Sequence, residues 1–293
     1  MTTDSYAELP NQRVSAANGV EYAYRDAGSG PLPLVLLQHF RGNLDSWDPA
    51  LVDALSEGRR VVAFDNVGVG GTSGTTPNSI RGMAHGATAF IAAMGFGQVD
   101  LLGFSIGSFV AQEIALLRPG VVRRVVLASS APEGAPGMHG WAPEVIGAVG
   151  KPETSAEEYL SVFFTQSETS RQAGKAAMGR MYARKEDRDR AVTWETRLNQ
   201  YDAVCEWGIP THGLLQKVSA IDVPVFIASG DSDPMILPRY SYLLAGLIPQ
   251  STIKVYPDSA HGFLFQHAAE FAADVAEFLG APMMQKAATS GES

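Results

Sequence analysis

The sequence predicts an α/β fold: a mostly parallel, eight-stranded sheet with helices on both faces and a helical insertion. Three observations predict it. Short apolar runs that suit buried strands alternate with amphipathic helical segments, an order typical of parallel sheets. The dipeptide Asn18-Gly19 indicates an antiparallel hairpin near the start of the chain. Residues 144–217 have helical periodicity and no strand pattern, so we expect one α/β body that a helical block interrupts.

The expected elements follow one another in a simple order. Residues 1–11 are polar and are predicted to form a loose arm, and residues 281–293 a frayed tail. The predicted strands are 13–17, 20–25, 34–37, 61–64, 99–102, 122–128, 225–229 and 252–256. The predicted helices are 45–58, capped by Asp45 or Ser46, and then 79–94, 109–117, 144–149, 155–164, 170–184, 193–207, 240–247 and 268–279.

Composition narrows the classes of partner. The chain has 293 residues and a formal net charge of −9, which argues against binding to nucleic acid. Its single cysteine, Cys205, excludes an intrachain disulfide and is interpreted as a packing residue. The polar N-terminus lacks the apolar core of a signal peptide, and no apolar run approaches the length of a membrane span. We therefore expect a cytoplasmic protein with no membrane partner.

A Gly-x-Ser-x-Gly turn at residues 103–107 lies between an apolar strand and a helical segment. This context is the one in which such a turn exposes a nucleophilic serine. Ser105 must adopt a strained backbone conformation for its hydroxyl to stand clear of the turn. Side chains at positions 103 and 107 would obstruct it, which explains the two glycines. Ser105 is therefore the predicted nucleophile.

His261 is the expected general base for this serine. A hydroxyl needs a base within hydrogen-bond reach to act as a nucleophile near neutral pH. Of the six histidines, only His261 follows the last predicted strand and precedes a glycine. A carboxylate should orient it, and three are candidates after predicted strands: Asp231, Asp233 and Glu133.

Over residues 12–280 the chain resembles the α/β-hydrolase family. The resemblance implies a Ser-Asp-His triad in that chain order, with the acid fourth in its turn, and so selects Ser105, Asp233 and His261. It also implies a core domain of residues 1–132 and 218–293 with a helical cap of residues 133–217. It rests on four motifs in the family's order: the loop 38–43, the turn 103–107, Gly-Asp-Ser-Asp at 230–233, and His-Gly at 261–262.

The resemblance also implies an oxyanion hole, a pair of backbone N–H donors for the charge that develops on the reacting carbonyl. Many relatives have His-Gly-Phe/Trp-Pro-Gly where this chain has Gln38-His39-Phe40-Arg41-Gly42. The implied donors are the N–H groups of Phe40 and Ile106. His39 departs from the pattern because it carries a side chain where a glycine usually lies. Arg41 could lie near the pocket mouth or on the surface, and the surface position is the favoured expectation.

The substrate pocket is expected to be apolar and of medium size. Elbow and loop residues should contribute to it together with residues of the insertion. The predicted lining residues are Phe104, Phe263, Trp141 and Met181.

Serine as the nucleophile favours acyl transfer, so we expect hydrolysis of a carboxylic ester or lactone of a small-molecule substrate. Relatives that cleave epoxides or carbon–halogen bonds use aspartate at this position. Two alternatives remain open: a cofactor-free haloperoxidase or perhydrolase, and a non-hydrolytic cyclase or C–C lyase. No metal pattern is present in the sequence, and the chemistry needs no cofactor. The oligomeric state stays open, a homodimer included.

Overall fold

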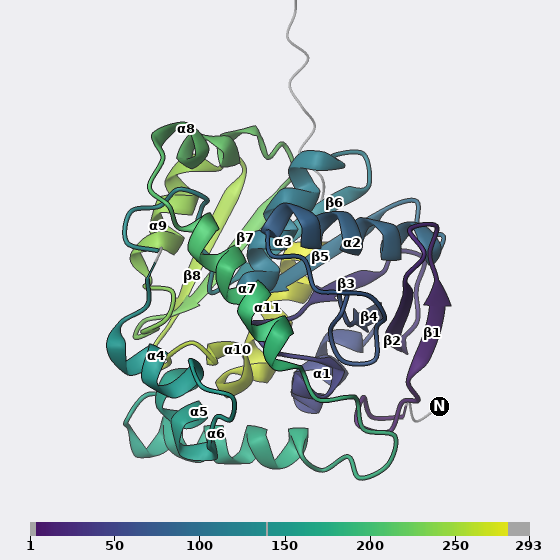
Figure 1. The fold of residues 1–293 in the computed structure, drawn as a ribbon, viewed down its shortest axis with the longest axis horizontal. Coiled ribbons are helices and arrows are strands. Elements are labelled where there is room, and N and C mark those ends of the chain that lie inside the picture. The colour runs from purple at the N-terminus through teal and green to yellow at the C-terminus, as the bar shows by residue number, and fades with distance from the viewer. Residues whose placement is uncertain (1–3, 139, 281–293) are drawn as a thin grey trace, which may run out of the picture.

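The structure, a computed structural model, describes residues 4–138 and 140–280. Its centre is an eight-stranded sheet in the order β1-β2-β4-β3-β5-β6-β7-β8 (Figure 1). The first two strands pair antiparallel, and β3 to β8 are parallel. The predicted fold class is confirmed. The strands are β1 (Gln12–Ser15), β2 (Glu21–Gly28), β3 (Leu34–Leu37), β4 (Arg60–Phe64), β5 (Val99–Phe104), β6 (Val122–Ala128), β7 (Val225–Gly230) and β8 (Ser251–Tyr256).

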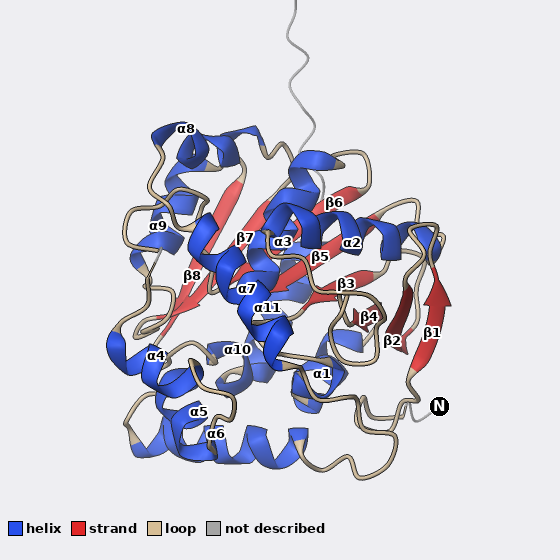
Figure 2. Ribbon diagram, in the orientation of Figure 1, coloured by secondary structure: helices blue, strands red, loops and turns tan. Residues whose placement is uncertain are grey.

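Helices cover both faces of this sheet. In Figures 1 and 2, α2 (Ile80–Ala93) and α3 (Ile106–Leu117) lie in front of the strands, and α11 (Ala268–Gly280) lies behind them. Every residue of β3 and β5 is buried, as expected for strands with helices on both sides. The remaining helices of the core are α1 (Pro49–Ser56), α9 (Arg239–Leu247) and the short α10 (Phe263–Gln266).

The segment between β6 and β7 contains helices and no strand in its described residues. Three of these helices gather at one end of the molecule, at the lower left of Figure 1, and α7 crosses in front of the strands. We call this set the inserted helices. They are α4 (Pro143–Val149), α5 (Ala156–Phe163), α6 (Glu168–Met181), α7 (Trp194–Trp207) and α8 (His212–Leu215).

Two local predictions are wrong. The helix expected over 45–58 is two helices: a 3-10 turn at Leu44–Ser46, and α1, which begins at Pro49. Asn43 caps the first and Asp48 the second, and neither Asp45 nor Ser46 is the N-cap. Several residues can cap a helix start, and the sequence alone does not rank them.

The predicted loose arm is also wrong for its described residues. Tyr6 is buried, and its hydroxyl donates to the carbonyl of Leu44 at 2.8 Å. Its backbone N–H and the Ser5 hydroxyl both donate to the carboxylate of Asp53, each at 2.7 Å. One aromatic side chain therefore fixes a segment whose composition is polar. The predicted tail, residues 281–293, lies outside the described residues.

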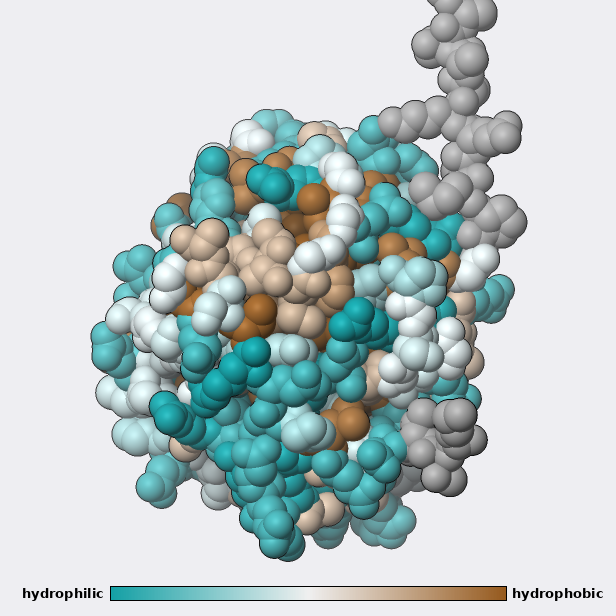
Figure 3. Space-filling model, turned by 90° about the vertical axis from the view of Figure 1, so that its right-hand side faces the viewer, coloured by the Kyte–Doolittle hydropathy of each residue, from teal (hydrophilic) through white to brown (hydrophobic). Residues whose placement is uncertain are grey.

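The surface is ordinary for a globular protein. On the face in Figure 3, hydrophilic residues dominate the lower half and apolar residues gather in the upper half. No helix in the described part of the chain has both the length and the apolar character that crossing a bilayer requires.

Candidate active site

The turn between β5 and α3 is a strained elbow. Ser105 has φ 57° and ψ −125°, a backbone conformation that residues other than glycine rarely adopt. A Cβ at Gly103 would lie 2.3 Å from the Gly107 carbonyl oxygen, and a Cβ at Gly107 would lie 2.1 Å from the Leu37 carbonyl oxygen. Only glycine fits at either position. The backbone N–H of Ser105 donates to the Ala128 carbonyl at 2.9 Å, which fixes the turn to β6.

The loops after β7 and β8 bring an imidazole and a carboxylate together. His261 Nδ1 lies 2.8 Å from Asp233 Oδ2, and both side chains are buried. The other oxygen, Asp233 Oδ1, accepts from the backbone N–H groups of Met235 and Ile236 at 2.8 and 2.9 Å. An ionised carboxylate only accepts hydrogen bonds, so Nδ1 carries the proton and Nε2 of a neutral His261 is an acceptor.

The two rival carboxylates have other partners. Asp231 accepts from the backbone N–H groups of Asp258 and Ser259 at 3.0 and 3.2 Å, so it stabilises the facing loop. Glu133 pairs with Lys217 at 2.9 Å. Of the three carboxylates, Asp233 is the one that hydrogen-bonds to His261.

Aromatic rings set the position of the His261 imidazole. Its ring centroid lies 5.0 Å from that of Phe104, the residue immediately before Ser105. On another side lies Phe163 of α5, at 5.2 Å. The Gly262 N–H donates to the Phe163 carbonyl at 2.8 Å. The imidazole is therefore held between the elbow and an inserted helix.

His39 brings a second imidazole into the same aromatic cluster. Its ring lies 5.2 Å from Phe104 and 5.3 Å from Phe163. Burial, with a smaller contribution from the nearby His261, lowers the pKa of His39 to about 3. Nδ1 lies 2.8 Å from the Phe40 carbonyl oxygen and therefore donates to it. Nε2 is buried and has no hydrogen-bond partner among the described residues.

The loop after β3 contains the backbone N–H of Phe40, one of the two expected oxyanion donors. Among the described residues, no protein acceptor binds the backbone N–H of Phe40. Ile106 is the first residue of α3, where an N–H has no partner within the helix. Two such groups, from the loop after β3 and from a helix N-terminus at the elbow, suit a developing oxyanion.

A cavity of about 550 Å³ lies between this loop and the inserted helices. His261 and Phe40 line it, as does Met181, one of the four predicted pocket residues. Further lining residues include Arg41, Tyr159, Phe163, Met178, Arg188 and Met235.

Three predicted pocket residues lie elsewhere. Phe263 stacks on Tyr256 in the core, with ring centroids 5.0 Å apart. Trp141 packs edge-on against the Phe40 ring at 5.2 Å, and Phe104 is enclosed by its aromatic neighbours. Large aromatic residues are more often core than lining, and the sequence does not separate the two roles. Ser105 is only 2% exposed and does not line the cavity either.

Arg41 takes the less favoured of its two expected positions. It lines the cavity, adopts φ 62°, and bonds through its backbone N–H to α7 and through its guanidinium to the segment between α4 and α5. Gln200 of α7, which accepts from the Arg41 N–H, was not predicted at all. No motif marks it, because its role depends on how α7 crosses the loop.

A comparison with known protein families identifies the family of this chain. The sequence model of the family described as "alpha/beta hydrolase fold" matches residues 33–268. The chain therefore belongs to the alpha/beta hydrolase fold family.

Three individual relatives extend the comparison. An alpha/beta hydrolase fold protein from Chitinophaga pinensis is 37% identical, with a TM-score of 0.89 over 95% of this chain and 100% of that one. The non-heme haloperoxidase of Rhodococcus erythropolis is 26% identical over 91% of this chain and 98% of that protein. The "Putative non-heme bromoperoxidase BpoC" of Mycobacterium tuberculosis is 32% identical over 37% of this chain, and that match spans only 41% of its own length.

Proposed function

We propose that this chain is a serine hydrolase that cleaves a carboxylic ester or lactone of an apolar, medium-sized substrate. Ser105 is the nucleophile, His261 the general base and Asp233 the orienting acid. The observation that carries the proposal is the buried 2.8 Å contact between His261 Nδ1 and Asp233, at the sheet edge where the strained Ser105 elbow lies.

The mechanism follows from the protonation states. His261 Nε2 takes the proton of the Ser105 hydroxyl as its oxygen attacks the substrate carbonyl carbon. The charge that forms on the carbonyl oxygen is stabilised by the N–H groups of Phe40 and Ile106. His261 then returns the proton to the departing alkoxide, which leaves an acyl-enzyme. Water, deprotonated by the same imidazole, releases the acid and restores Ser105.

Asp233 acts through His261. Its negative charge favours the imidazolium that forms during attack, and its hydrogen bond keeps the proton on Nδ1. The two backbone N–H groups that hold Oδ1 fix the carboxylate in this orientation.

The cavity supports an apolar substrate of medium size. Its volume of about 550 Å³ falls in the range of small-molecule sites, and methionine and aromatic side chains form part of its wall, beside the charged side chains of Arg41, Asp45 and Arg188. The buried Ser105 implies that side chains above it move when the substrate enters.

Cofactor-free haloperoxidase or perhydrolase chemistry is the second candidate. The relative from Rhodococcus erythropolis, which is named a non-heme haloperoxidase, favours this candidate because the alignment covers nearly the whole chain. The same triad and acyl-enzyme serve both reactions. In this alternative, hydrogen peroxide replaces water as the attacker of the acyl-enzyme and gives a peracid.

A fluorophosphonate probe tests the proposal. We expect it to add the phosphonyl group to Ser105 stoichiometrically, as read by intact mass and peptide mapping, and a panel of p-nitrophenyl esters and lactones to be hydrolysed. Ser105→Ala should abolish both. Absence of labelling in the folded wild-type protein would refute the proposed function. Turnover that requires peroxide and acetate would favour the alternative.

A further inference from the structure

Arg41 holds the loop that carries the proposed oxyanion donor. It follows Phe40 directly and has φ 62°, in the left-handed region that disfavours a residue with a side chain. Its backbone N–H donates to Gln200 Oε1 of α7 at 2.8 Å. Because Arg41 N and the Phe40 carbonyl belong to one peptide plane, this bond limits rotation about the Cα–C bond of Phe40, the residue whose N–H is the proposed donor.

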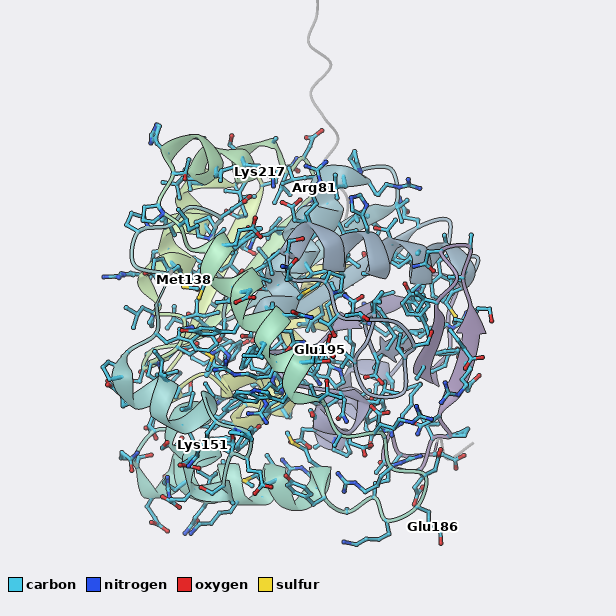
Figure 4. All side chains as sticks on the ribbon, in the orientation of Figure 1. Arg81, Met138, Lys151, Glu186, Glu195 and Lys217 are labelled. Carbon is cyan, nitrogen blue, oxygen red and sulfur yellow. The ribbon has the colours of Figure 1, made fainter. Side chains whose placement is uncertain are left out.

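The Arg41 side chain reaches a different part of the insertion. Its guanidinium donates to the carbonyls of Lys151 at 2.8 Å and Pro152 at 2.6 Å, just beyond the C-terminus of α4. Lys151, labelled in Figure 4, lies beside α4 and α5. The guanidinium also donates to the carbonyl of Val149, the last residue of α4, at 3.5 Å. Carbonyls in the last turn of a helix lack helical partners, and a cation there is favourable. The guanidinium therefore ties the loop after β3 to the segment 149–154.

Helix α7 is itself fastened to the core. The Thr196 hydroxyl donates to the Gly68 carbonyl and the Asn199 amide to the Thr76 carbonyl, each at 2.9 Å. The Trp207 indole donates to the Ala131 carbonyl at 3.1 Å. Gln200 is thus a fixed anchor, whereas the segment 149–154 packs at the cavity wall, where Val149 and Thr154 line it.

We propose that Arg41 and Gln200 are positioning residues that couple the seating of segment 149–154 to the orientation of the Phe40 N–H. When this segment is seated, both bonds hold the N–H toward the reacting carbonyl. When a substrate enters and displaces the segment, the guanidinium tie breaks and the hole loses one support until the insertion closes again. This proposal rests on the proposed function, because it assigns a role within the same oxyanion hole.

Amide hydrogen exchange tests the coupling without any turnover. In Arg41→Lys, one ammonium cannot bond two successive carbonyls as the planar fork does. We expect faster exchange in peptides covering both 38–43 and 149–154. Gln200→Leu should speed exchange in 38–43. Arg171→Lys and Gln172→Leu are matched controls on α6 whose bonds stay within the insertion, to Glu157 and Glu168, and they should leave 38–43 unchanged. Unchanged exchange in 38–43 for both test variants would overturn the proposal.

Phosphonylation tests the catalytic consequence. We expect Arg41→Lys and Gln200→Leu to lower the second-order labelling rate about 10- to 100-fold, somewhat less than outright loss of an oxyanion donor. Phenylboronic acid, a tetrahedral mimic, should bind more weakly by a similar factor, with KM for p-nitrophenyl acetate changed less than about threefold. Arg41→Gly relieves the positive φ but lacks the guanidinium, so its labelling should also fall.

Failure of the proposed function and failure of the positioning role give different results. If the wild type is not labelled, the proposed function fails, and the exchange comparison still decides the coupling. If the wild type is labelled and the folded variants match it in labelling rate and boronate affinity, the positioning role fails while the proposed function stands.

Discussion

At the scale of single residues, the hydrogen bonds around His261 distinguish two aspartates that lie two positions apart in one turn. Asp233 bonds to the imidazole, whereas Asp231 bonds to backbone N–H groups of the facing loop. The difference arises from where the chain turns after β7, and it gives the two residues separable roles.

Asp233→Asn should lower kcat for ester hydrolysis by about 10⁴-fold, because the amide favours the wrong imidazole tautomer. Asp231→Asn should change kcat by less than tenfold and chiefly lower the melting temperature. Steady-state kinetics and thermal unfolding of both variants make the comparison. A larger loss of kcat in Asp231→Asn than in Asp233→Asn would show that Asp231, and not Asp233, is the orienting acid.

His39 makes the stability of the protein depend on pH. The pKa of His39 in the folded state, about 3, lies below the usual value of 6.5. Between these pH values the unfolded state therefore binds a proton that the folded state does not bind. Stability is retained above pH 6.5 and is lost as the pH falls from there toward 3. At pH 5 the loss attributable to His39 should be about 2 kcal/mol.

Urea unfolding at pH 7 and pH 5 measures this dependence. His39→Gln should lose less stability between the two pH values than the wild type, while the control His85→Gln, at an exposed position of α2, should behave as the wild type. Identical pH dependence in His39→Gln and the wild type would contradict an unprotonated His39.

Much of the site was predictable at this scale, because the elbow and the histidine loop are local motifs. The partner of His261 was left open by residue chemistry alone and was selected by resemblance to a family pattern. Gln200 and its bond to Arg41 were missed, since this contact joins positions 159 residues apart. No local pattern encodes such a contact.

At the scale of elements, the β5–α3 elbow depends on how closely two backbones approach. A Cβ at Gly107 would lie 2.1 Å from the Leu37 carbonyl oxygen at the end of β3, an approach that exists only after β3 and β5 pair. Alternating strand and helix patterns predicted the eight strands and the longer helices, but not the short helices α8 and α10. The helix starts near residue 45 were predicted wrongly because several neighbouring residues there can act as N-caps.

Gly107→Ala should destabilise the fold by about 3 kcal/mol or more, because its Cβ would overlap a backbone oxygen that cannot move aside. Gly97→Ala is the matched control, with no atom within 4 Å of the added Cβ. Its stability should stay within about 0.5 kcal/mol of the wild type. Equal unfolding midpoints of the two variants in urea would show that the elbow tolerates a side chain.

At the scale of the whole molecule, the N-terminal segment joins the core to the insertion. Arg184, just beyond α6, donates to the carbonyls of Ala7 and Leu9, each at 2.8 Å, while Tyr6 bonds to Leu44 in the loop after β3. The mostly parallel sheet was predictable from the alternation of strands and helices. The packing of the N-terminal segment against the core was not predictable, because it depends on one tyrosine, Tyr6, whose contacts lie in segments distant in the sequence.

Tyr6→Ala should therefore destabilise the protein by about 3 to 5 kcal/mol, since it empties a buried aromatic site and leaves the Leu44 carbonyl without this donor. Tyr6→Phe keeps the ring and should lose only about 1 kcal/mol. Tyr242→Ala, at a tyrosine that is 59% exposed, is the control and should change the free energy of unfolding by less than about 0.5 kcal/mol. Urea denaturation ranks the three variants, and a Tyr6→Ala midpoint equal to that of Tyr242→Ala would mean that the arm is as loose as its composition suggests.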